Sequence, residues 1–213
     1  GDDYISNTRN WARTARPAAS TFKTYAAVAG MRHGFSLRSR LDGNAFTPDG
    51  GKTEVRNEND KSYGTVSLRQ AIAKSINTAF VDMVSRTKNG PKAVVQAATD
   101  AGVPRGTGWD LNNRIALGTA EVSPLAQAGG YATIADGGKK VTPHVVDKVV
   151  DQSGKVLYHA PSPSEQTIEA DISHDVTYAL RSVVEEGTGR IVADFDHQVA
   201  GKTGTSGVGE GVT

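Results

Sequence analysis

Residues 16–23 read Arg-Pro-Ala-Ala-Ser-Thr-Phe-Lys, and this stretch organises the interpretation of the rest of the chain. Pro17 favours an extended approach, and the Ala-rich run behind it predicts a helix over 18–29. Residues three apart lie on the same face of a helix. The side chains of Ser20 and Lys23 would therefore meet at the start of this helix, where backbone N–H groups have no partner within the helix.

A Ser hydroxyl becomes an effective nucleophile only beside a base. Lys23 can serve as that base if burial or nearby positive charge lowers its pKa enough to populate the neutral amine. The N–H groups of the helix start could also stabilise the oxyanion of an acyl-transfer transition state. The pattern is weak by itself, because roughly 0.8 Ser-x-x-Lys matches are expected by chance. A second match does occur at residues 85–88, and we interpret it as a polar helix end.

Ser75, Ile76 and Asn77 form a second motif, between two stretches that we predict to be helical, 68–74 and 78–87. A hydroxyl at this break could relay a proton to a leaving group, and an Asn amide can hydrogen-bond both ends of a peptide unit. Roughly 0.6 Ser-x-Asn matches are expected by chance. A simple helix cap is the competing interpretation, because both residue types favour caps.

The third motif is Lys202-Thr203-Gly204-Thr205, on a short segment, 198–206, that is predicted to be a strand. The Lys charge and the Thr hydroxyls could hold a substrate carboxylate, and Gly lets the backbone approach a ligand closely. Roughly 0.1 Lys-Thr-Gly matches are expected by chance, and the three motifs in this order have a chance probability on the order of one in a hundred. Together they favour an acyl-transfer site over coincidence.

The composition excludes several classes of function. The chain has 24 Lys and Arg against 23 Asp and Glu, a net charge of +1, so the basic patch of a nucleic-acid-binding protein is not expected. Without cysteine, neither thiolate catalysis nor a disulfide framework is available. The five histidines have no metal-ligand spacing, so we expect no metal and no organic cofactor. No apolar run is long enough to span a bilayer.

Start and stop signals organise the remaining chain into further elements. Pro and Ser at helix starts, with Gly at helix ends, predict helices over 91–100, 125–135 and 174–186. Alternating apolar and polar residues around a turn predict a β-hairpin over 143–158. Clustered turn residues predict a loop-rich excursion with short strands over 31–65. The expected class is therefore α+β, dominated by helices.

The three motifs resemble the signature of penicillin-binding proteins and class A β-lactamases. The likeness is more specific to the transpeptidase domain of the bifunctional, class A penicillin-binding proteins. Residues 16–23 resemble the nucleophile segment of that family, and residues 67–80 resemble its second-motif helix pair. Residues 116–124 and 130–138 resemble a further block of the same family. The resemblance runs over essentially the whole chain.

The resemblance implies a role for each motif residue. Ser20 would be acylated, with Lys23 favoured as its base among the candidates debated for such enzymes. Ser75 would shuttle the proton. The substrate-binding residues would be Asn77, Lys202, Thr203, Gly204 and Thr205. Backbone N–H groups of Ser20 and Thr205 would form the oxyanion hole.

The resemblance also implies a penicillin-binding protein/β-lactamase-like serine acyltransferase fold, with a helical subdomain and a central antiparallel sheet. Of that sheet, only the Lys-Thr-Gly strand falls within the 213 residues. We therefore expect residues 1–213 to be an incomplete transpeptidase domain that lacks flanking strands and does not act alone, with 31–65 as a loop-rich insertion within it. Ala19 stands where the family commonly has Gly.

The implied function is a D,D-transpeptidase that cross-links peptidoglycan stem peptides ending in D-Ala-D-Ala through a serine acyl-enzyme and is inhibited by β-lactams. Its parent protein would be membrane-anchored and would act outside the bacterial cytoplasmic membrane. That parent could also carry a glycosyltransferase domain and bind cell-wall synthesis partners.

Three alternatives stay open at this point. A class A β-lactamase needs a Glu three residues before a Leu-Asn pair, but Gly108 occupies that place before Leu111 and Asn112. A penicillin-binding sensor domain would be acylated without transferring the acyl group. An unrelated helical module would need all three motifs to be accidents.

Overall fold

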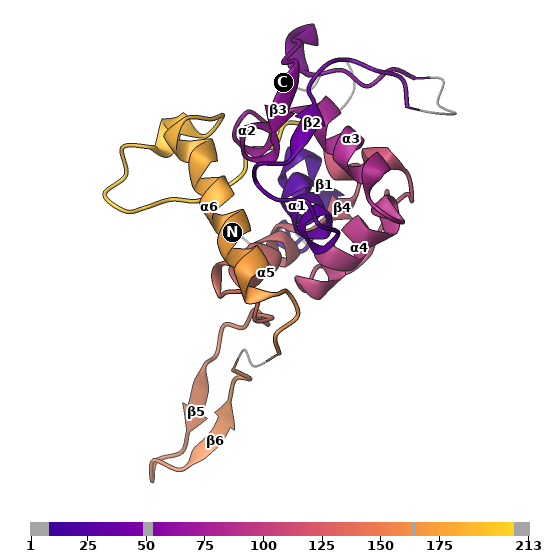
Figure 1. Ribbon diagram of the computed structural model, residues 1–213. Helices are drawn as coiled ribbons and strands as arrows, with labels where there is room; N and C mark the ends of the chain where they lie inside the picture. The colour runs from indigo at the N-terminus through magenta and orange to yellow at the C-terminus, as the bar shows by residue number, and fades with distance from the viewer. Residues whose placement is uncertain (1–8, 49–52, 163–164, 207–213) are drawn as a thin grey trace.

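The computed structural model describes residues 9–48, 53–162 and 165–206, and the loop-rich segment 31–65 is therefore described except for 49–52. Helices pack around one central helix, and a β-hairpin extends away from them (Figure 1). The helices are α1 (Lys23–Arg32), α2 (Leu68–Ala73), α3 (Asn77–Arg86), α4 (Gly90–Asp100), α5 (Pro124–Ala135) and α6 (Ala170–Glu185). Short 3₁₀ helices are η1 (Ala19–Phe22), η2 (Glu58–Asp60), η3 (Asn113–Leu117) and η4 (Arg190–Val192).

Strands pair two by two. β1 (Arg16–Pro17) pairs antiparallel with β4 (Glu121–Val122), and β2 (Arg40–Asp42) pairs with β3 (Thr65–Ser67). β5 (Lys148–Val150) and β6 (Val156–His159) form the extended hairpin, as the sequence predicted. The loops between α1 and α2 thus carry short strands, while their standing as an insertion within the domain stays a prediction.

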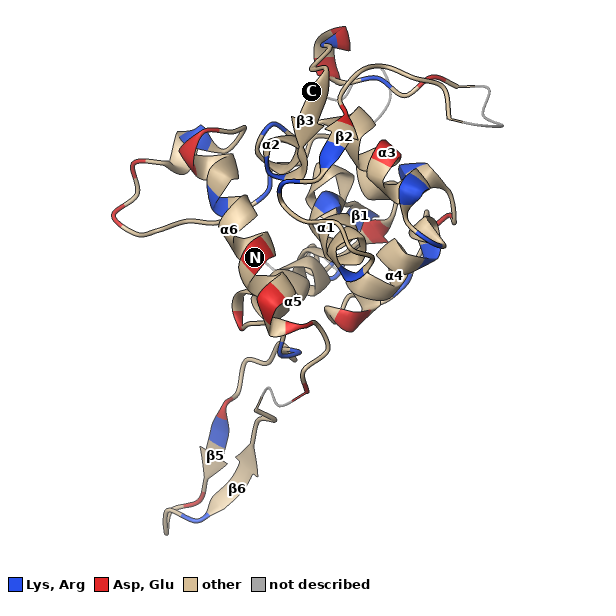
Figure 2. Cartoon of the chain, viewed as in Figure 1, with Lys and Arg blue, Asp and Glu red and all other residues tan. Residues whose placement is uncertain are grey.

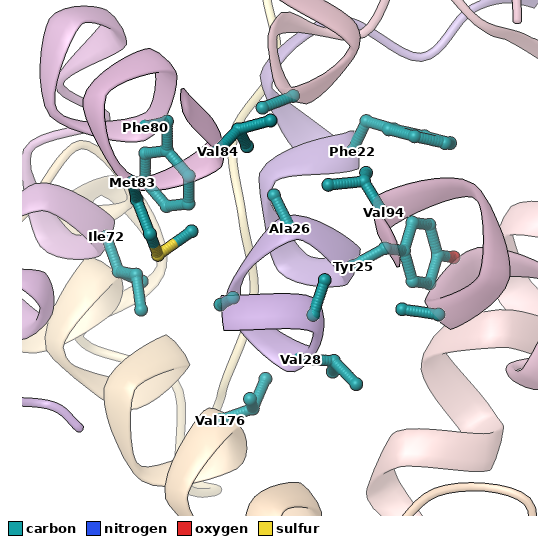
Figure 3. Close-up of a cluster of buried hydrophobic side chains, with 14 of the residues drawn as sticks. Phe22, Tyr25, Ala26, Val28, Ile72, Phe80, Met83, Val84, Val94 and Val176 are labelled. Atoms are coloured by element: carbon teal, nitrogen blue, oxygen red, sulfur yellow. The ribbon is translucent and has the colours of Figure 1, made fainter. Parts of the chain in front are cut away.

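Helix α1 is the centre of the core. Every residue from Lys23 to Met31 is buried, as expected for a helix that is surrounded by other elements on all sides. Figure 3 shows the apolar side chains that surround it, among them Phe80, Met83 and Val176 from neighbouring helices. Lys23 is therefore a fully buried amine at the edge of an apolar core, and its charged form is costly there unless it is well partnered.

Local capping chemistry explains where two of the outer helices begin. Ser67 accepts a hydrogen bond from the N–H of Gln70 at 3.1 Å, and its own N–H donates to Gln70 Oε1 at 2.9 Å, a capping box that starts α2. Ser123 caps α5 by accepting from the N–H of Ala126 at 3.2 Å, with Pro124 in the first turn. Both starts are those that the sequence predicted.

Three predicted elements differ in the structure. The helix expected over 18–29 begins as η1 and continues to Arg32, because Gly30 packs inside α1 against Met83 instead of ending it. Helix α6 starts at Ala170, one turn before the predicted start. Residues 198–206 form no strand, since none of the described residues offers them a strand partner, and an unpaired extended segment cannot form a ladder.

Charged residues of both signs are interspersed over the elements in the view of Figure 2. None of the described helices is both long and apolar enough to cross a membrane.

Candidate active site

The three sequence motifs converge on one cleft of about 840 Å³. Ser20 comes from η1, Ser75 and Asn77 come from the break between α2 and α3, and Thr203 and Thr205 come from the segment near the C-terminus. Segments more than a hundred residues apart in the chain are therefore brought together as one site.

Lys23 lies at the centre of this arrangement. Its Nζ is 3.0 Å from Ser20 Oγ and 3.2 Å from Ser75 Oγ. It also donates to the backbone oxygen of Ser75 at 2.7 Å and to Asn77 Oδ1 at 2.6 Å. One buried amine therefore joins the first two motifs.

The partners of Lys23 define what its amine can do. The Ser75 carbonyl and Asn77 Oδ1 only accept hydrogen bonds, so they occupy two N–H groups. A neutral amine then keeps its lone pair for the side on which the hydroxyls of Ser20 and Ser75 lie, 3.0 and 3.2 Å from Nζ. Burial is the largest cause that lowers the pKa of Lys23 well below its usual value, followed by the charge of Lys202. Glu58 acts in the opposite direction.

The orientation of the Asn77 amide is fixed from both ends. Its Oδ1 accepts from Lys23, and its Nδ2 donates to the backbone oxygen of Arg56 at 3.1 Å. A flipped amide would place its NH₂ group against the Lys23 amine and its oxygen against the Arg56 carbonyl. Asn77 therefore holds Lys23 and borders the cleft at the same time.

Ser75 occupies a strained backbone position. The N–H of Ser75 donates to Ile72 O at 3.2 Å and that of Ile76 donates to Ala71 O at 3.0 Å, the Schellman pattern that ends α2. Ser75 stands at the left-handed position of this motif, with φ of 56°, where Gly is usual. A hydroxyl-bearing residue at such a position suggests a functional requirement for that hydroxyl.

Backbone hydrogen bonds from the segment before α5 hold the residues directly before Ser20. The N–H of Ala18 donates to Ala120 O at 2.9 Å, and that of Ala19 donates to Gly118 O at 2.9 Å. Ala19 has φ of 50°, so the residue directly before Ser20 is also left-handed. The helix start that the sequence predicted after Pro17 is thus a 3₁₀ turn, and hydrogen bonds to the backbone oxygens of Gly118 and Ala120 hold the residues at its start.

The Lys-Thr-Gly segment lies beside the turn that carries Ser20 without being a strand. Lys202 donates to the backbone oxygen of Thr203 at 3.0 Å, and burial lowers the pKa of Lys202 to about 8. A Cβ on Gly204 would lie 3.0 Å from Thr21 Cγ2 and 3.3 Å from Ala18 O, so a small residue allows this close approach. Thr203 and Thr205 line the cleft.

One wall of the cleft was not found by sequence reasoning. It is made by the loop that carries η2, with Glu54, Arg56, Asn57, Glu58, Asn59 and Asp60 lining the cleft. Asn57 fixes this loop, because its buried side chain accepts from Thr78 N at 3.0 Å and donates to Gly43 O and Lys61 O. Arg114, Leu117 and Thr188 complete the lining. No short motif marks these residues.

The second Ser-x-x-Lys match lies elsewhere. Ser85 Oγ donates to the backbone oxygen of Asp82 at 2.7 Å within α3 and does not line the cleft. Its interpretation as part of a polar helix end is confirmed. No group of three or more His, Cys, Asp and Glu side chains that could hold a metal ion occurs in residues 9–48, 53–162 and 165–206.

The family profile described as the penicillin-binding protein transpeptidase domain matches residues 2–212. The chain belongs to this transpeptidase family. Penicillin-binding protein 1A of Mycolicibacterium smegmatis is 32% identical, over 96% of this chain and 28% of that protein. The same-named protein of Aquifex aeolicus is 31% identical, over 91% of this chain and 27% of that protein. The chain thus spans less than a third of the length of these curated relatives.

Solved structures give the same family. Penicillin-binding protein PonA1 of Mycobacterium tuberculosis matches with a TM-score of 0.86 at 29% identity, over 99% of this chain and 58% of that one. The PonA1 complex with penicillin V matches with a TM-score of 0.75 at 30% identity, over 84% and 50% of the two chains. The predicted α+β fold and the resemblance to class A penicillin-binding proteins are confirmed. The relatives favour a transpeptidase over a β-lactamase.

Proposed function

We propose that this transpeptidase domain is a serine D,D-acyltransferase that acts on peptidoglycan stem peptides ending in D-Ala-D-Ala. The observation that carries the proposal is the buried Lys23 amine, which lies within hydrogen-bonding distance of the hydroxyls of Ser20 and Ser75. An uncharged amine beside a Ser hydroxyl is the arrangement that activates a serine nucleophile without histidine.

Acylation follows from these contacts. The Lys23 lone pair takes the proton of Ser20 as Oγ attacks the carbonyl carbon of the penultimate D-Ala. The oxyanion that forms would accept from the backbone N–H groups of Ser20 and Thr205. The proton passes through the Ser75 hydroxyl to the leaving nitrogen, the peptide bond breaks, and D-Ala departs. The product is an ester between the stem peptide and Ser20.

Transfer reverses the proton path. An amine of a second stem attacks the ester carbonyl and loses a proton to Lys23. The new amide forms as Ser20 Oγ leaves and regains its proton, so the cycle needs no cofactor. A β-lactam follows the first half of this path, and its opened ring blocks the second half.

Carboxylate recognition is assigned to the Lys-Thr-Gly segment. Lys202 supplies positive charge, while the Thr203 and Thr205 hydroxyls line the cleft as hydrogen-bond donors. Asn77 would bind the substrate backbone, and Gly204 permits the close approach of this segment. The cleft is wide enough for an extended peptide, because its volume of about 840 Å³ falls within the usual range of ligand sites.

The substrate sets the place of action. Peptidoglycan lies outside the cytoplasmic membrane, so the protein that carries this domain would act on that side of the bacterial membrane. Penicillin-binding protein 1A relatives are much longer than this chain, which supports a full-length protein with further segments. We propose that these segments include a membrane anchor and a glycosyltransferase domain, and that the full-length protein binds cell-wall synthesis partners.

Labelling with a fluorescent penicillin tests the proposal. The full-length protein that carries this chain should form a stable adduct, and Ser20→Ala should abolish it, whereas Ser85→Ala in the second Ser-x-x-Lys match should label normally. Labelling of Ser20→Ala at the rate of the unsubstituted protein would refute the mechanism. Loss of the adduct within seconds would instead favour the β-lactamase alternative. A stable adduct without product from a stem-peptide donor and an amine acceptor would favour the sensor domain.

A further inference from the structure

Thr188 belongs to no sequence motif, yet its hydroxyl lies 2.5 Å from the hydroxyl of Thr203. Both residues are exposed and line the cleft that contains Ser20. Thr188 comes from the turn between α6 and η4, whereas Thr203 belongs to the Lys-Thr-Gly motif. The third motif is therefore in direct contact with a residue to which no role has been given.

The turn that carries Thr188 is fixed in place by helix α2. The N–H of Thr188 donates to Ala73 O at 3.1 Å. A Cβ on Gly187 would lie 2.1 Å from that same oxygen, so only glycine permits the approach. The preceding Glu186 forms a 2.8 Å ion pair with Arg69. Thr188 is thus attached to the helix whose end carries the second motif, and it contacts the third.

The hydrogen bond between the hydroxyls of Thr188 and Thr203 can have either residue as its donor. If Thr188 donates to Thr203, the Thr203 O–H stays free to donate into the cleft, and accepting a hydrogen bond strengthens that donation. If Thr203 donates to Thr188, its only proton is used within the pair. A carboxylate can only accept, so a carboxylate beside Thr203 selects the first arrangement.

We propose that Thr188 is a positioning residue for carboxylate recognition: it donates to Thr203 and so directs the Thr203 hydroxyl toward the terminal carboxylate of the donor peptide or β-lactam. The inference rests on the proposed function and deepens it. Thr188 acts through Thr203 and takes no part in the proton transfers at Ser20. It affects how strongly a carboxylate ligand is bound before acylation.

The test compares two probes in the purified full-length protein that carries this chain: a labelled penicillin with a free carboxylate and its methyl ester. Thr188→Val removes the hydroxyl at nearly constant shape and should lower the second-order acylation rate by the free acid about tenfold. The loss should lie in the binding constant and leave the limiting acylation rate unchanged. Acylation by the ester should fall much less, because its neutral carbonyl accepts a weaker hydrogen bond than a carboxylate does. Thr188→Ser should restore the behaviour of the unsubstituted protein. Adding Thr188→Val to Thr203→Val should cause no further loss.

Controls separate this inference from the proposed function. Thr99→Val removes a hydroxyl that bonds within α4, away from the cleft, and should change neither probe. If Thr188→Val slows both probes equally, or slows neither while Ser20→Ala abolishes labelling, the inference is overturned and the proposed function stands. If neither probe acylates the unsubstituted protein, both the inference and the proposed function are overturned.

Discussion

The backbone N–H of Ala19 donates to the carbonyl oxygen of Gly118 at 2.9 Å, directly before the proposed nucleophile. Gly118 is itself left-handed, with φ of +83°, and a Cβ there would lie 1.9 Å from Ala19 O. The left-handed backbones of Ala19 and Gly118 are thus in direct contact, and this contact sets the direction of the Ser20 N–H. The family block over residues 116–124 therefore holds the backbone of the nucleophile turn in place.

Gly118→Ala should displace this turn. Because the added Cβ meets backbone rather than a movable side chain, we expect at least a tenfold loss in penicillin acylation and about 2–4 kcal/mol in the free energy of unfolding. Labelling kinetics and urea unfolding measure the two effects. Ala19→Gly in the same chain should recover part of the acylation, because it frees the opposing backbone.

Gly34→Ala is the matched control for that prediction. Gly34 has φ of +90° but no atom within 4 Å of an added Cβ, so only the backbone strain of about 1–2 kcal/mol remains. Its acylation should be unchanged. Equal acylation losses in both variants would show that global destabilisation, and not the lost contact between Gly118 and the backbone of Ala19, causes the loss.

Ser75→Gly should make the protein more stable and less active. Glycine relieves the left-handed φ of 56°, which we expect to raise the free energy of unfolding by about 0.5–1 kcal/mol after the added entropy of the unfolded chain. Acylation should fall at least tenfold, because the proton relay is lost. Ser75→Ala should lose the same activity without the gain in stability. Full activity in either variant would remove Ser75 from the mechanism.

Acylation should follow a bell-shaped pH profile. The rate constant for a carboxylate β-lactam should rise with pH as Lys23 loses its proton, at a pH well below the ordinary pKa of lysine. It should fall above about pH 8, where Lys202 becomes neutral and the carboxylate loses its charged partner. Stopped-flow labelling across pH measures both limbs. A rate that rises without a fall through this range would argue against Lys202.

Two substitutions should move the rising limb in opposite directions. Lys202→Gln removes a positive charge that lowers the pKa of Lys23, so the limb should move to higher pH. Glu58→Gln removes a negative charge that raises it, so the limb should move to lower pH. Shifts of the same sign would mean that another group controls this limb.

Asn57→Ala should destabilise the wall of the cleft. The substitution removes the hydrogen bonds of a buried amide and leaves the N–H of Thr78 and two backbone oxygens without their partner, which we expect to cost about 2–4 kcal/mol of unfolding free energy. Urea unfolding measures the loss. Asn59→Gly, on the exposed part of the same wall, should be neutral or slightly stabilising, since Asn59 has φ of 55°.

Local chemistry made several features predictable. The helix starts after Ser67 and Ser123, the hairpin turn and the predominance of helices all depend on neighbours within a few residues, and they occur as expected. The three motifs could be found because each carries its chemistry in three or four adjacent residues. The position of the loop held by Asn57 as a wall of the cleft could not be predicted, because the partners of Asn57, Gly43 and Thr78, are distant in sequence. The predicted strand over 198–206 was wrong because strand formation requires a partner.

Ser20 and Lys23 show where the boundary lies. The sequence by itself determined that the two side chains stand three residues apart near a helix start, since that spacing follows from local geometry. Only the tertiary structure decided that Lys23 is fully buried, that the Ser75 carbonyl and Asn77 occupy its N–H groups, and that Gly118 holds the turn. Burial lowers a pKa through the loss of water on every side, and that loss depends on contacts between segments that no single stretch of sequence contains.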